Sequence, residues 1–168
     1  KIGDRESTDS ILPLVQDPVE AVREASVTAM GRIKPPATDT IVALLAQALE
    51  DPVESVKQAA VIAIGEIEPD PRFLEPIVGL LRSSNAATRK AAARALLQID
   101  SSQSVSSLIA AGQDSDPEVR QGIVAAVGEV GSVAVSPWLR ERLAHDSSPG
   151  VRTEAAYRLG MRSDVEAK

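Results

Sequence analysis

The sequence predicts an all-α protein, an α-solenoid in which antiparallel helix pairs stack one after another. Three observations predict this fold: a core of small aliphatic residues, a segment that recurs at a nearly constant spacing, and helix signals at the same place in each copy. Of the 168 residues, 43% are hydrophobic but only 2% are aromatic. A core made mainly of Ala, Val, Ile and Leu favours helices packed on helices over a ring-rich β-sandwich.

One segment recurs five times. The nine residues from Asp17 return almost unchanged from Asp51, and more loosely from Ser83, Asp114 and Asp146. A basic residue six positions later marks each copy, with steps of 34, 32, 31 and 32 residues between Arg23, Lys57, Arg89, Arg120 and Arg152. A repeat of this length indicates a stacked array. We therefore expect one domain over residues 1–168, with repeats at approximately 9–33, 38–67, 73–99, 103–130 and 133–162.

Each copy has the pattern of two helices. The second helix opens with an Asp or Ser cap followed by Pro, in Asp17-Pro18, Asp51-Pro52, Asp116-Pro117 and Ser148-Pro149. A cap oxygen satisfies free N–H groups of the first turn, and Pro fits the first helical position. Apolar or small residues then recur at 3,4 spacing and form one stripe. A pair of about 30 residues cannot bury its own apolar face, so neighbouring pairs must stack.

The composition excludes several classes of function. The net charge of −6 opposes binding to nucleic acid and to anionic membranes, and the chain has no cysteine and a single histidine, His145. Disulfides, thiolate ligands and most metal sites are therefore excluded. We expect no cofactor, no catalytic residue and no membrane span, and hence a protein that is not an enzyme. The chain opens with Lys1 and without the apolar stretch of a signal peptide, which does not by itself fix its location. A cytoplasmic location is the expectation.

The repeated residues resemble a known family. Asp17, Val22 and Arg23, with the equivalent residues of the later copies and a glycine eight residues after the basic marker, are similar to the short HEAT-like repeat also found in phycobilin lyase subunits. The resemblance covers residues 9 to 162 and implies a right-handed superhelix of helix pairs. Copy three departs from the pattern, with Ser83 for Asp, Thr88 for Val and Leu97 for Gly.

The resemblance implies a structural role for the repeated charges. In that family, the carboxylate holds N–H groups of its turn and the basic side chains of neighbouring copies, forming a ladder along the stack. A reaction centre would occur once, whereas the marker occurs five times. The expected ladder comprises Asp17, Arg23, Asp51, Lys57, Arg89, Asp114, Arg120, Asp146 and Arg152.

The outward face of the second helices is the candidate binding surface. Residues one, five and nine positions after the marker lie opposite the buried stripe and differ from copy to copy. The resemblance implies that these helices line a concave side. The selected partner-binding residues are Glu24, Arg32, Gln58, Ile62, Lys90, Arg94, Gln121, Glu129 and Tyr157. Residues 76 to 99 contain four basic residues and no carboxylate, so an acidic segment could dock there; the alternative is a solvated face.

Three functions come into question for such a repeat protein. A non-catalytic scaffold that binds another protein requires only the repeat frame. The alternative is a phycobilin lyase-like or phycobilisome-related protein that handles bilins or chromoproteins, although the outward face offers one aromatic residue, Tyr157. A HEAT-like DNA glycosylase ranks last because the chain is acidic. The iron-binding His-Glu pairs of the deoxyhypusine hydroxylases, which share the repeat, do not occur.

Trp138 is expected to pack, or else to anchor a partner. The oligomeric state is left open.

The two ends of the array differ in polarity. In copy five, Glu154, Arg158 and Arg162 replace apolar stripe residues, which predicts that this copy is a C-terminal cap with a solvated outer face. The first copy has no such substitutions. We therefore expect the apolar surface around Ile11, Leu14 and Val15 to be partly uncovered, or covered by an upstream segment or another chain.

Overall fold

The protein is built from helices. A computed structural model describes residues 2–99, 101–130 and 133–166, with the side chains of residues 6–99, 103–130 and 134–161. These ranges contain α-helices, short 3-10 helices and turns, and no strand. They form two compact units, Lys1–Asp100 and Ser101–Lys168. None of the helices within the described ranges is both long and apolar enough to cross a bilayer.

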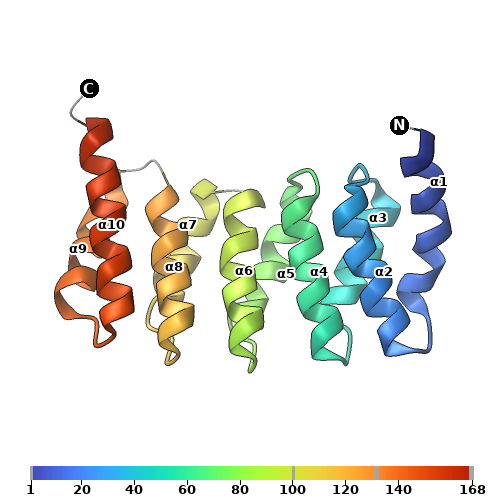
Figure 1. Ribbon diagram of the computed structural model, residues 1–168, viewed down its shortest axis with the longest axis horizontal. Helices are drawn as coiled ribbons and strands as arrows, with labels where there is room; N and C mark the ends of the chain where they lie inside the picture. The colour runs from blue at the N-terminus through green and yellow to red at the C-terminus, as the bar shows by residue number, and fades with distance from the viewer. Residues whose placement is uncertain (1, 100, 131–132, 167–168) are drawn as a thin grey trace. The chain divides into compact units, whose positions relative to one another are not determined.

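The first unit contains three copies of the repeat. Its elements are α1 (Ile2–Ile11), the 3-10 helix η1 (Leu12–Gln16), α2 (Glu20–Ile33), α3 (Asp39–Leu49), α4 (Glu54–Glu66), the 3-10 helix η2 (Pro71–Phe73), α5 (Leu74–Leu80) and α6 (Ala86–Ile99). Helices α2, α4 and α6 lie side by side in one layer, with α3 and α5 behind them (Figure 1). Within this unit, α2 therefore packs on α4, and α4 packs on α6.

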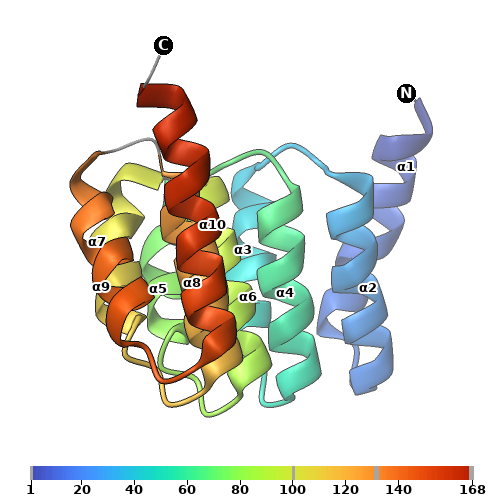
Figure 2. The same cartoon turned by 60° about the vertical axis from the view of Figure 1, so that its left-hand side comes forward.

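The second unit contains the last two copies. Its elements are α7 (Ser101–Ala111), α8 (Pro117–Glu129), the 3-10 helix η3 (Val133–Val135), α9 (Ser136–His145) and α10 (Pro149–Glu166). Helix α10 packs against both α8 and α9, and Figure 2 shows α8 and α10 in one layer and α7 and α9 in the other. The predicted helix pairs are thus present in every copy, and the all-α fold class is confirmed.

The predicted apolar stripe is buried in the middle of the first unit. In α4 every stripe residue from Val56 to Ile67 is buried, and Ile64 is 2% exposed. In α2 the equivalent stripe is only partly covered, because Ala25 is exposed while Met30 is fully buried. On the side away from α4, α2 is packed only by α1 and the short 3-10 helix η1, and Ala25 remains accessible.

Glycine allows the second helices to approach closely. A Cβ atom added to Gly31 would lie 2.9 Å from the Cα of Ala63, which is closer than real Cβ contacts come. The same repeat position in the last copy is Gly160, where an added Cβ would meet no atom within 4 Å. Gly31 is therefore required for the packing of α2 on α4, whereas Gly160 lies on an open side of α10.

The first two copies start their second helices later than predicted. Val19 and Val53 are the N-cap residues of α2 and α4, and no side chain caps these helices. The carboxylates of Asp17 and Asp51 instead accept a hydrogen bond from the backbone N–H two residues ahead, at 2.8 and 2.9 Å. The cap prediction was wrong for these copies because a carboxylate bound in this turn cannot reach the next helical turn. It was right for Asp116, which caps α8.

The orientation assigned to the polar residues of copy five was also wrong. Arg158 does not point toward the open end; it lies on the side of α10 that packs against α8. Its aliphatic stem occupies the space beside Gly128, and its guanidinium pairs with Glu129 at 3.1 Å and with Glu154 at 2.7 Å. Arg162 lies outside the described side chains. That this copy caps the stack stays a prediction, now without the support of Arg158.

Substitution of glycine tests this packing. Gly31→Ala should destabilise the protein, because the new methyl group overlaps the backbone of α4 and overpacking costs typically about 1 to 3 kcal/mol. Gly160→Ala should stabilise it by up to about 1 kcal/mol, since alanine favours the helix and meets no neighbour. Urea denaturation followed by circular dichroism measures both. Equal effects of the two variants would contradict the assigned packing.

Candidate partner-binding groove

An arginine–aspartate pair joins the first two copies. The guanidinium of Arg23 donates from Nε and Nη2 to the two carboxylate oxygens of Asp51, at 2.7 and 3.0 Å. Its remaining Nη1 donates to the backbone carbonyl of Asp17 at 2.9 Å, in its own copy. Both side chains are largely buried, at 14% and 9% exposure. One arginine therefore ties the turn of its own copy to the turn of the next.

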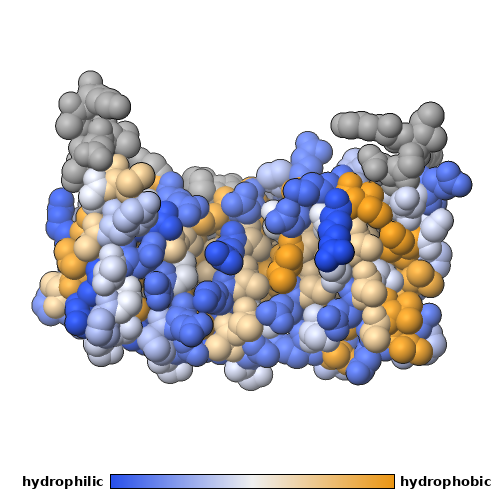
Figure 3. All heavy atoms as spheres, in the orientation of Figure 1, coloured by the Kyte–Doolittle hydropathy of each residue, from blue (hydrophilic) through white to orange (hydrophobic). Residues whose placement is uncertain are grey.

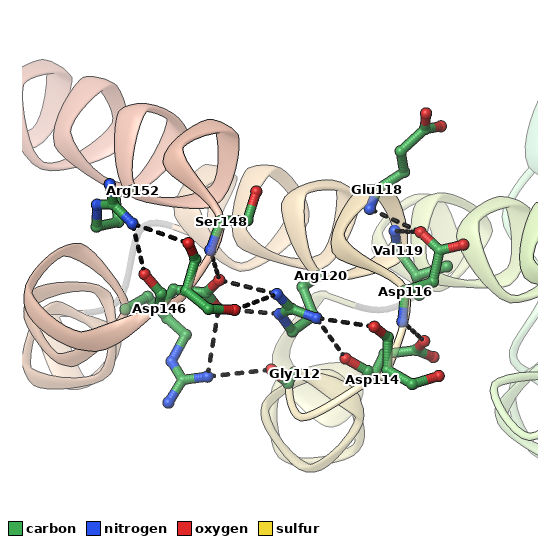
Figure 4. Close-up of polar contacts among 12 residues, drawn as sticks. Gly112, Asp114, Asp116, Glu118, Val119, Arg120, Asp146, Ser148 and Arg152 are labelled. Carbon is green, nitrogen blue, oxygen red and sulfur yellow. Dashed lines mark hydrogen bonds and ion pairs between the residues drawn. The ribbon is translucent and has the colours of Figure 1, made fainter.

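The same arrangement recurs in the second unit, where it is more buried. Arg120 donates to both carboxylate oxygens of Asp146 at 2.9 Å and to the carbonyl of Asp114 at 2.8 Å (Figure 4). Asp146, with its side chain 2% exposed, also accepts from the N–H of Ser148. Arg152 and Arg89 each donate to the carbonyl six residues earlier in their own copies, at 2.8 and 2.9 Å.

Copy three has a different connection to copy two. Ser83 stands in place of the aspartate, and Lys57 pairs within its own copy with Glu54 at 3.8 Å. Glu54 takes over the bridging role, because its Oε1 accepts from Ser83 at 3.2 Å and from the fully buried Thr88 at 2.5 Å. Sequence reasoning missed Glu54. The signal was available, since two of the three departures of copy three from the pattern, Ser83 and Thr88, are hydroxyl residues.

The pairs shift the pKa values of their members. Hydrogen bonds from Arg23 hold the pKa of the Asp51 carboxyl below its usual value, and hydrogen bonds from Arg120 do the same for Asp146. The carboxylates in turn raise the pKa values of Arg23 and Arg120. These carboxylates are stabilised in the charged form, which suits a structural contact and not proton transfer near neutral pH.

The selected outward residues lie mostly at the surface. Glu24, Arg32, Arg94, Gln121 and Glu129 are exposed, as are Ile62 and Tyr157 at 54% and 57%, while Gln58 and Lys90 are half-buried. Some already have partners in the protein: Glu24 accepts from Ser55 at 2.7 Å, and Glu129 pairs with Arg158. Figure 3 shows this side of the molecule, where apolar surface lies among hydrophilic side chains.

Four of these residues come together in one groove of the first unit. The groove has a volume of about 670 Å³ and runs between α4 and α6, with Gln58 and Ile62 on one wall and Lys90 and Arg94 on the other. Its lining also includes the following residues: Lys34, Val61, Gly65, Glu66, Ile67, Pro69, Ala87, Ala91, Ala95 and Gln98. Alanine and glycine between the longer residues of the two walls leave the surface hollow. We call this site the α4–α6 groove.

The lining determines what the groove can bind. It contains three cationic side chains and one carboxylate, Glu66, which pairs with Lys34 at 2.7 Å. Ile62 offers apolar surface between these charges, and none of the lining side chains is aromatic.

Both aromatic residues singled out from sequence, Trp138 and Tyr157, lie in the other unit. Trp138 packs there against Gly112, with the Arg142 guanidinium 5.8 Å from its ring centre, so the packing interpretation is confirmed.

The apolar surface expected at the first copy is divided. Val15 is 4% exposed and therefore covered, whereas Leu14 is 41% exposed and Ile11 is half-buried. The first helix of this copy, α1, begins at Ile2, is mostly polar and precedes the short 3-10 helix η1. The predicted open surface is thus confined mainly to Leu14.

The comparisons with known proteins agree with this architecture. The sequence matches the HEAT repeat family over residues 1–65, 41–124 and 75–160. The chain belongs to the HEAT repeat family. No curated protein matches it.

Solved structures show the fold of these HEAT repeats. A designed armadillo repeat protein in complex with peptide (KR)4 is similar with a TM-score of 0.68 and 21% identity, covering 90% of this chain and 80% of that chain. Computationally designed armadillo repeat proteins for modular peptide recognition are similar with a TM-score of 0.63 and 20% identity, covering 89% of this chain and 79% of that chain. An engineered protein is similar with a TM-score of 0.64 and 19% identity, covering 95% of this chain and 87% of that chain. The chain is an α-solenoid.

Removal of one arginine tests the connection between turns. Arg120→Ala should lower the free energy of unfolding by about 1.5 to 3 kcal/mol, because Asp146 loses its bidentate partner while remaining buried. Lys57→Ala is the matched control at the same repeat position, and should cost less than about 1 kcal/mol because its ion pair is long and more exposed. Urea unfolding followed by circular dichroism measures both. A larger loss in the lysine variant would overturn the assignment.

Stability should also depend on acid pH. A carboxyl whose folded pKa lies below its unfolded value contributes fully above about pH 4, and this contribution is lost as the pH falls through the folded pKa. Asp51 and Asp146 are such groups. We expect the free energy of unfolding to be nearly constant from about pH 5 to 7 and to fall below about pH 4. In Arg120→Ala the fall should be shallower; an unchanged slope would contradict the role of Asp146.

Proposed function

We propose that this HEAT repeat protein is a non-catalytic scaffold that binds a segment of another protein along the second helices, with the α4–α6 groove as the principal contact. The single observation that carries the proposal is Ile62. This residue is 54% exposed, on the wall of a hollow whose other wall is cationic. An exposed apolar side chain within a groove, surrounded by polar groups, is the usual composition of a recognition site.

The repeat architecture supports the proposal. The fold is shared with designed proteins for modular peptide recognition. We propose that the second helices line the concave side of a right-handed superhelix, and that the chain acts as one repeat domain. The family match over residues 41–124, which runs from the first unit into the second, supports the single domain. A continuous repeat array offers an extended surface to a partner.

A protein partner fits the groove better than the two other ligands considered. A bilin is a large conjugated open-chain tetrapyrrole, and the groove offers it no aromatic side chain to stack on. The repeated Asp and Arg residues are engaged in turn contacts and lie apart from the groove, as the contacts of Arg23 show. We therefore propose a structural role for the ladder residues and assign them no reaction.

A charge placed in the groove should abolish binding. Peptides selected by the protein from a displayed library of random peptides provide the ligand, and isothermal titration calorimetry measures their affinity. Ile62→Asp should weaken binding at least about tenfold, because the apolar contact is lost and a charge is buried on binding.

Ala43→Asp is the matched control for this experiment. Ala43 is an exposed residue of α3 in the other layer, and it does not line the groove. This variant should bind as the unmodified protein does. Equal binding by both variants would exclude the α4–α6 groove as the site.

A further inference from the structure

The α6 wall of the groove is cationic. Lys90 and Arg94 stand one helical turn apart on α6, and residues 76 to 99 contain no carboxylate at all. Arg94 is exposed, and no ion pair or hydrogen bond of its side chain is found within the described residues. In a chain of net charge −6 this wall is a local reversal of sign. It attracts a negatively charged ligand over a distance of about one Debye length.

The only carboxylate in the groove lies away from this wall. Glu66 is on α4, and its Oε2 lies 2.7 Å from the Nζ of Lys34, the C-cap residue of α2. Ile62 lies one turn earlier on the same helix, and Gln58 one turn earlier still. The two walls therefore differ in chemistry: α6 presents cations, and α4 presents an apolar side chain followed by an internally compensated charge pair.

The spacing of the walls sets the spacing of the ligand groups. Helices α4 and α6 are in contact, since an added Cβ at Gly65 would lie 3.7 Å from the Cα of Ala95. Axes of packed helices lie about 8 to 10 Å apart. An extended chain advances about 3.3 Å per residue, so a segment that crosses from one wall to the other spans about three residues.

From these features we infer that the groove recognises an acidic protein segment in extended conformation, with its carboxylates on Lys90 and Arg94 and an apolar side chain, about three residues away, on Ile62. The inference rests on the proposed function and specifies the chemistry of the partner. It differs from the recognition of a basic peptide, because the wall that Lys90 and Arg94 form is positively charged. An apolar anchor with charged neighbours gives affinity and specificity together.

Nucleic acid is the other polyanion that a cationic wall could attract. Single strands bind through aromatic side chains on which the bases stack, and none lines this groove. The remainder of the chain is acidic and repels a long phosphate backbone. An acidic segment of a protein, which needs only two cations and one apolar contact, fits the observations better.

Fluorescence anisotropy with a labelled peptide tests the inference. The probe is Ser-Leu-Ser-Ser-Glu-Glu-Asp-Ser, compared with a peptide that has lysine in place of its three acidic residues and with one that has serine in place of leucine. The acidic peptide should bind, and both altered peptides should bind at least about tenfold more weakly. Raising the salt concentration from about 0.05 to about 0.5 M should weaken binding of the acidic peptide.

A pair of charge reversals locates the contact. Arg94→Glu should lower the affinity for the acidic peptide at least about tenfold, because it replaces attraction by repulsion in the groove. Arg82→Glu changes the net charge equally, but Arg82 is exposed and lies outside the groove, so its effect should stay within about twofold. Circular dichroism of both variants confirms that they fold.

Several results would overturn the inference. It fails if the acidic peptide does not bind, if the lysine peptide binds as well, if the two reversals act equally, or if a single-stranded oligothymidine binds more tightly with the same dependence on Arg94. These results leave the proposed function to its own test. If Ile62→Asp abolishes binding of library-selected peptides that are not acidic, the groove is a protein-binding site and only the inferred partner chemistry is wrong.

Discussion

A bidentate contact between an arginine and the turn of the following copy is the polar interaction that joins copy one to copy two and copy four to copy five. Asp51 and Asp146 each use one carboxylate for two purposes, accepting N–H groups of their own turn and both arms of an arginine from the preceding copy. Two parallel hydrogen bonds between a planar guanidinium and a carboxylate restrict how the two groups can lie, so this contact orients adjacent copies as well as joining them. The apolar stripe supplies most of the buried area but little orientation, because apolar contact is non-directional.

Copy three lacks this arginine–aspartate pair and contacts the preceding copy through other polar residues. When the aspartate becomes Ser83 and the valine becomes Thr88, a buried hydroxyl needs an acceptor, and Glu54 reaches across to provide it. The acceptor, Glu54, belongs to the preceding copy, and the donors belong to the following copy. In the arginine–aspartate pairs the preceding copy donates and the following copy accepts. Copy three thus keeps a polar link to its predecessor by different residues, and its second helix carries the cationic wall of the groove.

Much of the fold could be predicted from sequence because it depends on short-range patterns. The constant step between basic residues and the 3,4 spacing of apolar residues identify the helix pairs without any knowledge of tertiary contacts. Predictions that depended on which neighbour a side chain meets were less reliable. Arg158 was placed toward the open end because its repeat position is apolar elsewhere, yet that position faces the preceding copy, where Gly128 leaves room for its stem. The cap role predicted for Asp17 and Asp51 was wrong because a turn competes with a helix cap for one carboxylate, whereas the turn contact expected of them as ladder residues is present.

The groove could be predicted only in part. Counting from the basic residue identified Gln58, Ile62, Lys90 and Arg94 as outward positions, and these four residues do line one hollow. The hollow itself depends on what lies between them, namely Gly65 and the alanines of α6, which in sequence are indistinguishable from core residues. Small residues that allow two helices to pack closely also lower the surface between them. The same choice of residue thus creates the contact between copies and the space in which a partner can bind, which explains how a repeated frame generates a distinct site at one position of the array.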